Sequence, residues 1–185
     1  MAEVTVDDFF WDTFFWKATV LLPPWIGFQS RRGPYASQDG AAASNGNIEV
    51  VFAPEGRDES PLLDSEIRLV RWAVENAPAM QRSLLDGLLQ QYPSLRRTYA
   101  GSVEPEEMPP IGSVDEFRTL IGLSSINVHQ LEKDGLPYVG FEFGCTWDGE
   151  HGLGVLMHGT RIVEIGGADT AILLWTARRD AEMST

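Results

Sequence analysis

The side chains most able to do chemistry gather in the last third of the chain: Glu142, Cys145, Asp148, Glu150, His151, His158 and Asp169. Carboxylate and imidazole groups are ligands of zinc, manganese and iron, and they also serve as general acids and bases. The spacing matches no established metal motif. The leading interpretation is therefore no metal, no cofactor and no catalytic residue. In the alternative, Asp148, Glu150, His151 and His158 hold a metal, or these four act with Glu142 as acid and base.

Cys145 has the partners of a thiol nucleophile, because His151 and His158 could act as a base and Asp169 as an orienting acid. Its position in the sequence pattern favours another role. Phe141, Phe143, Cys145 and Trp147 alternate with small or polar residues, as on the buried face of a strand. We therefore predict that Cys145 lies in the core, where a thiol behaves as a small hydrophobic group.

A second group of candidates lies in the segment Trp25–Tyr35. It places Arg31 and Arg32 beside aromatic residues, a composition typical of interface anchors. In the alternative, the aromatic side chains cover a sheet edge and the arginines pair with nearby acids. A third interpretation has Arg31, Arg32 and Arg161 bind a small anion.

The composition limits the classes of partner. The chain has 185 residues and a formal net charge of −13, which opposes binding to nucleic acid and favours a basic protein partner. The charge could also serve solubility alone. The single cysteine cannot form an internal disulfide, no apolar run approaches the roughly 20 residues of a membrane span, and the acidic N-terminus lacks the pattern of a signal peptide. We therefore expect a cytoplasmic protein that does not bind a membrane. The oligomeric state is open.

The hydrophobic periodicity predicts one α+β domain over residues 1–185. Residues 1–53 should form strands near 14–22 and 48–52, joined by a long loop. Residues 60–122 should be helical, with one helix from Pro61, a second from Asn76 that ends before Pro93, and a short third opened by a Ser113–Glu116 capping box. Residues 123–177 should form an antiparallel meander and a closing helix, and residues 178–185 a flexible tail. The expected fold is an antiparallel sheet of five to seven strands with helices on one face.

The segment Phe141–Val155, together with His158, Arg161–Glu164 and Gly167–Asp169, resembles uncharacterised bacterial domain families that share a W-D-x-E-H-G-L-G-V hairpin. The earlier stretch G-F-Q-S-R-x-G-x-Y looks like part of the same pattern. The resemblance implies a domain of unknown function, in a toxin-immunity or defence context, and it transfers no catalytic residue.

These observations favour a non-enzymatic protein-interaction domain, and more specifically an immunity-type inhibitor of a basic, toxin-like partner. The alternative is a small metal-dependent or acid–base hydrolytic enzyme that uses the Asp148–His158 region. The residues that we expect to bind the partner are Arg31, Arg32, Tyr35, Trp147, Asp148, Glu150, His151, Arg161 and Asp169.

Overall fold

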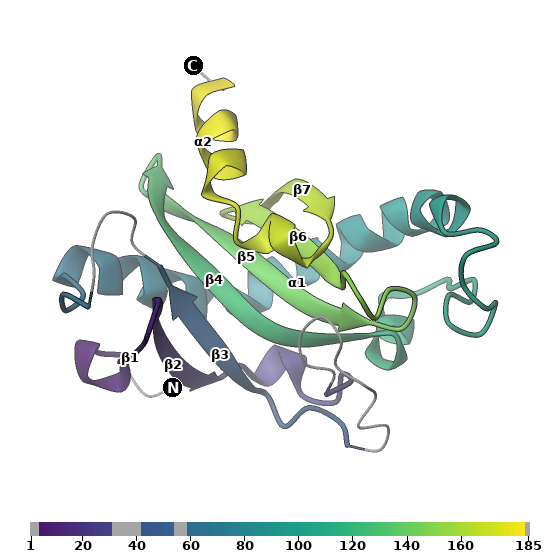
Figure 1. Cartoon of the computed structure of the whole chain (residues 1–185), viewed down its shortest axis with the longest axis horizontal. Coiled ribbons are helices and arrows are strands. Elements are labelled where there is room, and N and C mark those ends of the chain that lie inside the picture. Colours follow the sequence, from purple (N-terminus) through teal and green to yellow (C-terminus); the bar gives the residue numbers. More distant parts are fainter. Residues whose placement is uncertain (1–3, 31–41, 54–58, 184–185) are drawn as a thin grey trace.

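A seven-stranded sheet organises the chain in a computed structural model that describes residues 4–30, 42–53 and 59–183 (Figure 1). Arg31, Arg32 and Tyr35 lie outside the described residues. The strands follow one another in chain order: β1 (Phe10–Asp12), β2 (Phe15–Leu21), β3 (Asn47–Phe52), β4 (Ile121–Lys133), β5 (Leu136–Cys145), β6 (Leu153–His158) and β7 (Arg161–Gly166). Five of the six neighbouring pairs are antiparallel, while β3 and β4 run parallel. The α+β class and the C-terminal meander are thus confirmed.

The connection between the parallel strands β3 and β4 contains the helix α1 (Asp64–Thr98). A parallel pair needs such a crossover, because the chain must return to the same end of the sheet. In Figure 1, α1 crosses behind the sheet. The short 3-10 helix η3 (Val114–Thr119) then leads into β4, and it begins with the predicted capping box between Ser113 and Glu116.

The prediction of two helices between Pro61 and Pro93 was wrong, because α1 is one helix of 35 residues that contains Pro78 and Pro93. It also begins later than expected, at Asp64, with the Glu66 carboxylate accepting a hydrogen bond from the Leu63 backbone N–H. A proline inside a helix costs about 3 kcal/mol or more. Here the apolar stripe continues on both sides of Pro78, and its buried side chains include Val70, Val74, Met80, Leu84 and Leu88. Their burial offsets the lost backbone hydrogen bonds.

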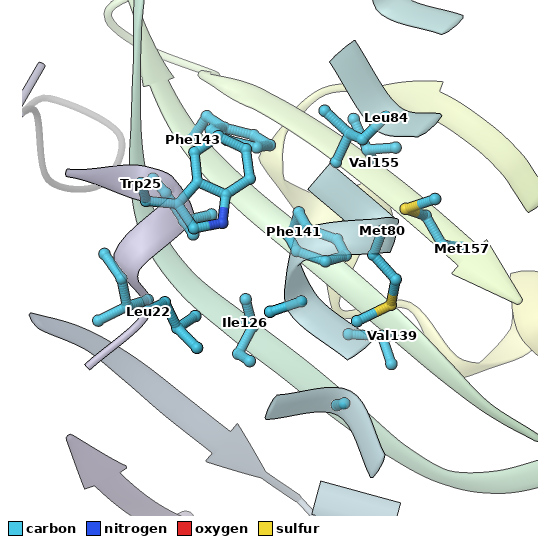
Figure 2. Packing of buried hydrophobic residues seen from close by; sticks show 14 of the residues in the cluster. Leu22, Trp25, Met80, Leu84, Ile126, Val139, Phe141, Phe143, Val155 and Met157 are labelled. Carbon is cyan, nitrogen blue, oxygen red and sulfur yellow. The ribbon is translucent and has the colours of Figure 1, made fainter. Parts of the chain in front are cut away.

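The main core lies between α1 and one face of the sheet, which we call the covered face. Figure 2 shows Met80 and Leu84 of α1 close to Phe141, Val155 and Met157. Trp25, in the 3-10 helix η2 (Pro23–Trp25), is fully buried, and its ring lies 5.0 Å from the ring of Phe28 and 5.3 Å from that of Phe143. Cys145 is buried with these residues, as predicted.

The opposite face of the sheet, which we call the open face, carries the C-terminal segment over β5 and β6. A Cβ atom added to Gly140 would lie 1.8 Å from the Ala171 carbonyl oxygen, so the 3-10 helix η4 (Ala168–Ala171) packs directly on the strand. Tyr138 and Leu156 form a small second cluster with Ala177 of helix α2 (Leu174–Met183). Helix α2 thus packs against the open face, whereas α1 packs against the covered face, and the expectation of helices on one face stays a prediction.

The C-terminal end also differs from the expectation of a closing helix up to Trp175 and a flexible tail from Arg178. Instead, α2 continues to Met183, and ion pairs join it to β7. Arg161 donates to both carboxylate oxygens of Asp180, at 3.1 and 2.6 Å, and Arg179 pairs with Glu164 at 2.6 Å. Within the described part of the chain, no helix is both long and apolar enough to cross a membrane.

Candidate functional site

A groove of about 560 Å³ lies on the open face, over β2 to β5, where the sheet is bordered by the segment from Ile172 to Arg178. We call it the open-face groove. Apolar side chains stand at both sides, with Phe15 on β2 and Trp175 on α2 among them. The floor is polar, and its side chains come from neighbouring strands: Lys17, Glu49, Ser125, Asn127, His129 and Glu142. Apolar walls and a few converging polar groups are the usual composition of a binding site.

The strand register places the polar floor in two rows. In the first row, Glu49 of β3 lies beside Ser125 of β4, and Ser125 lies beside Glu142 of β5. In the second row, Asn127 lies between Val51 and Gly140, with Lys17 beyond Val51. Side chains at paired positions point to the same face of a sheet, about 5 Å apart. Two carboxylates thus flank Ser125 across the sheet.

A hydrogen-bond chain fixes the orientation of these floor residues. Ser125 donates its hydroxyl proton to Glu142 at 3.0 Å, since an ionised carboxylate can only accept. The Ser125 oxygen then accepts a hydrogen bond from the Asn127 side-chain amide at 3.2 Å. The Asn127 side chain is therefore held with its nitrogen toward Ser125 and its carbonyl oxygen elsewhere.

His129 fastens the C-terminal segment over the end of this floor. Its ring nitrogen Nε2 lies 3.0 Å from the Ala171 carbonyl oxygen, an arrangement in which Nε2–H donates. Burial lowers the pKa of His129, and the hydrogen bond to Ala171 opposes that shift only in part. The imidazole is thus held in its neutral form as a structural contact between β4 and η4.

A second hollow adjoins the groove, and Glu142 and Ile172 line both. We call it the acidic depression. Its lining contains four acids and no lysine or arginine among the described residues: Tyr99, Glu142, Asp148, Glu150, His151, Gly167, Ala168, Asp169 and Ile172. The structure thus brings together Glu142, Asp148, Glu150, His151 and Asp169, five of the residues singled out in the sequence.

Asp148 is the best-fixed acid of the depression. Its carboxylate accepts hydrogen bonds from the Tyr99 hydroxyl at 2.9 Å and from the His151 backbone at 2.8 Å, and the His151 ring lies at 3.2 Å. Burial opposes ionisation of Asp148, but these hydrogen bonds prevail and lower its pKa. Burial also raises the pKa of Tyr99 to about 12, assisted by the same hydrogen bond. Asp148 therefore orders the turn that carries Glu150 and His151.

Three further predicted residues lie elsewhere. His158 pairs with Tyr138 in the register, whereas Glu142 pairs with Gly154, so the expected approach of Glu142 to His158 does not occur. The His158 Nε2 atom contacts the Lys133 carbonyl oxygen at 2.9 Å. Trp147 is buried, 5.7 Å from the ring of Tyr92, which leaves it unable to act as an exposed binding residue. Arg161 is engaged by Asp180.

The positions of the described side chains do not support a metal site or a catalytic thiol. Among the described residues, no three His, Cys, Asp or Glu side chains are grouped so that they could hold a metal ion. Cys145 points into the core, and its thiol lies 3.5 Å from the Asp148 carbonyl oxygen instead of a histidine ring. The arrangement of Cys145, His151 and His158 is therefore not that of a nucleophile with its base.

The sequence pattern alone did not identify Lys17, Glu49, Ser125, Asn127 or His129 as site residues. A signal was present in β4, where Ser125, Asn127 and His129 alternate with the apolar residues Ile126 and Val128. Such an alternation is usual for a strand with one solvated face. Only the register across three strands shows that Ser125 and Asn127 share one groove with Glu49 and Glu142.

Residues 34–173 match a protein family that is described as a domain of unknown function (DUF6985). The match covers well over half of the chain. The chain belongs to this family. No curated protein and no solved structure matches it. The expectation of an uncharacterised domain family is thus confirmed, whereas the hairpin signature and the bacterial origin stay predictions.

The DUF6985 match and the open-face groove overlap in part. The matched residues include five of the six floor residues: Glu49, Ser125, Asn127, His129 and Glu142. They also include the whole acidic depression. Phe15 and Lys17 precede the match, and Trp175 follows it. In this chain the polar floor thus belongs to the DUF6985 region except for Lys17, while flanking segments add aromatic walls.

Proposed function

We propose that this chain is a non-enzymatic protein-binding domain for a basic partner, and that it binds through the open face of its sheet. One observation carries the proposal: an open groove with exposed apolar walls adjoins a depression lined by four acids and no described lysine or arginine. The immunity-type role suggested by the sequence resemblance is the finer form of the same proposal. In that role the domain would cover a functional surface of a basic toxin.

The surface has the two components of a protein interface. Ile172 and Trp175 are 54% and 53% exposed, so burying them against a partner would contribute apolar contact area. The acids of the depression would attract and orient cationic groups at one end of that contact. The net charge of −13 would add long-range attraction to a basic protein. Apolar walls would provide affinity, and the acids would provide selection.

The alternative prediction, a hydrolase in the Asp148–His158 region, is less well supported. His158 lies apart from the acidic depression, and the depression has no serine, threonine, cysteine or lysine among its described lining residues. Asp148 already accepts three hydrogen bonds or close contacts from Tyr99 and His151. An acid–base reaction there would depend on Glu142, Glu150, Asp169 and an exposed His151.

Partner capture followed by a defined binding measurement tests the proposal. The full chain is cross-linked in its native cells, the captured protein is identified and purified, and its affinity is measured by calorimetry. We expect Ile172→Ala to weaken binding, because this side chain lines both hollows. Leu63→Ala is the matched control, since Leu63 is 57% exposed and lies at the start of α1. Equal affinity of the two variants and the wild type would place the interface elsewhere, and turnover of a substrate by the purified chain would contradict a non-enzymatic role.

A further inference from the structure

The open-face groove has an imbalance between hydrogen-bond donors and acceptors. Lys17 is engaged by Asp12 at 2.9 Å and by Glu49 at 3.3 Å. The Ser125 hydroxyl proton goes to Glu142, and the His129 Nε2–H goes to the Ala171 carbonyl. Lys17, Ser125 and His129 therefore each donate to a group inside the protein, and Arg178, which also lines the groove, has a partner of its own.

Acceptors of the same floor are not occupied in this way. Asn127 uses its amide nitrogen toward Ser125, which leaves its side-chain carbonyl oxygen without a donor in the described chain, although the residue is only 9% exposed. Glu142 accepts from Ser125 through one carboxylate oxygen, and its other oxygen has no hydrogen-bond donor among the described residues. Neither oxygen is among the fully buried unpartnered atoms of the described chain, and both residues line the groove. Each oxygen can therefore accept a hydrogen bond from a ligand that supplies donors.

The positions of these acceptors limit the chemical class of ligand that can bind in the groove. Glu49 and Glu142 flank Ser125 in one row, and Asn127 lies in the next row on the same strand as Ser125. A planar guanidinium carries five N–H donors in a fork and can reach acceptors on neighbouring strands, whereas an ammonium is a compact point charge. The apolar walls at Phe15 and Ile172 suit the methylene stem of a long cationic side chain.

We infer that the open-face groove binds an arginine side chain of the partner protein, with its guanidinium donating to Glu142 and Asn127. The inference rests on the proposed function and deepens it, because it assigns the basic partner a specific residue and a specific seat. Glu49 adds a second carboxylate at the edge of that seat. The acidic depression next to it attracts the neighbouring basic groups of the partner but does not form the seat.

A peptide titration tests the inference without knowledge of the natural partner. The probe is acetyl-Leu-Arg-Leu-amide, and the control peptide replaces arginine by citrulline, which has nearly the same shape but no charge. Binding to the full ¹⁵N-labelled chain is followed by amide chemical shifts. We expect saturable shifts at Ser125, at Glu142 and at the Asn127 side-chain amide. The citrulline peptide should bind about tenfold more weakly, because it loses charge-assisted hydrogen bonds.

Matched variants distinguish binding of the arginine peptide in the groove from general electrostatic attraction to acidic side chains. Glu142→Gln should lower the affinity for the arginine peptide about tenfold, since the glutamine amide keeps an acceptor for Ser125 but lacks the negative charge. Glu150→Gln, which removes the same charge from the depression alone, should change affinity less than about twofold. If Glu142→Gln proves unfolded by thermal denaturation, Glu49→Gln at the groove edge replaces it. Its expected effect is a weakening of about threefold, because Glu49 is a more exposed carboxylate.

Three results would overturn the inference: no shifts in the groove at millimolar peptide, equal binding of the citrulline peptide, or equal losses with Glu142→Gln and Glu150→Gln. None of these would by itself remove the proposed function, which is judged on the captured partner. If that partner bound wild type and Glu142→Gln equally but lost affinity with Ile172→Ala, the binding face would stand and the arginine seat would be wrong.

Discussion

At the scale of single residues, the hydrogen bond from Ser125 to Glu142 determines which groups of the open-face groove can still accept hydrogen bonds. Ser125 has a single hydroxyl proton, and it donates this proton in a hydrogen bond to Glu142. Ser125 must then accept from Asn127, so Asn127 presents its carbonyl oxygen instead of its amide. Replacing Glu142 by an apolar residue would free Ser125 to donate elsewhere. The character of the groove as an acceptor surface therefore depends on one carboxylate on β5.

We predict that Cys145 reacts slowly with thiol reagents in the native protein. The residue is 1% exposed and packs with the core, so reagent reaches it only after local opening. Labelling of the native and the denatured protein with an aromatic disulfide at neutral pH measures the difference. Rapid stoichiometric labelling of the folded chain would contradict the structural role.

We predict that the burial of His129 makes the protein less stable to unfolding as the pH is lowered. Burial lowers its pKa in the folded state, whereas the unfolded chain binds a proton near the ordinary value of about 6.5. The unfolded state then binds more protons, so the free energy of unfolding falls as the pH drops below about 6.5 toward the folded pKa. Above that range the effect is absent. Urea unfolding at several pH values between 5 and 8 measures it.

The control for this pH effect is His129→Gln, whose amide nitrogen can take the place of Nε2–H toward Ala171. This variant should lose part of the pH dependence while keeping the same fold. Exposed His151 provides a comparison, because His151→Gln should leave the dependence largely intact. If both variants kept the wild-type dependence, other groups would be responsible.

At the scale of elements, glycines determine where the C-terminal segment sits. Gly140 on β5 and Gly154 on β6 leave room for the backbone of Gly167 to Ala171. The added Cβ atoms would meet backbone atoms, which cannot move as a flexible side chain would. This close approach brings Ile172 and Trp175 to the border of the groove. Gly140 and Gly154 thus help to position the wall of the groove, although neither residue lines it.

Gly140→Ala should destabilise the fold by about 1 to 3 kcal/mol, as expected for overpacking in a tight contact. It should also shift the amide signals of Ala171 and Ile172, since η4 must move away from β5. Gly149→Ala is the control, because a Cβ atom at that position meets nothing within 4 Å and the backbone is not left-handed. Denaturant unfolding compares the two. A loss of similar size in Gly149→Ala would show that the effect is not due to η4.

At the scale of the whole molecule, charge should govern the rate of association with a basic partner. The net charge of −13 attracts such a protein at long range, and salt screens that attraction beyond about 8 Å at physiological ionic strength. Association should therefore slow several-fold as salt is raised from about 20 to 500 mM, while dissociation changes little. Stopped-flow or surface-plasmon measurements with the captured partner give both rates.

The double variant Asp148→Asn with Glu150→Gln assigns part of this effect to the acidic depression. It removes two charges at nearly constant shape and should reduce both the association rate and its salt dependence. The Asp148 change also weakens the contacts with Tyr99 and His151, so Glu150→Gln alone serves as the structurally neutral comparison. If neither salt nor the double variant changed the association rate, the negative charge would serve solubility and would not steer binding.

The sequence by itself determined much of the meander. Alternating residues predicted the antiparallel meander that contains β4 to β7. Asp134-Gly135, between β4 and β5, is a typical hairpin-turn sequence, and both residues have positive φ, 53° and 74°. The same alternation placed Cys145 in the core. These features depend on contacts between residues close in the chain, and local periodicity therefore reveals them.

Only the tertiary structure decided how distant segments combine. The sequence predicted a new helix from Asn76 that ends before Pro93, but packing of one apolar stripe on the sheet keeps α1 continuous through Pro78 and Pro93. The parallel pairing of β3 with β4 brings Glu49 beside Ser125, 76 positions later in the sequence. The groove arises from that register and from the η4 segment seated on two glycines. No local pattern encodes such a site, because its residues become neighbours only when the sheet has formed.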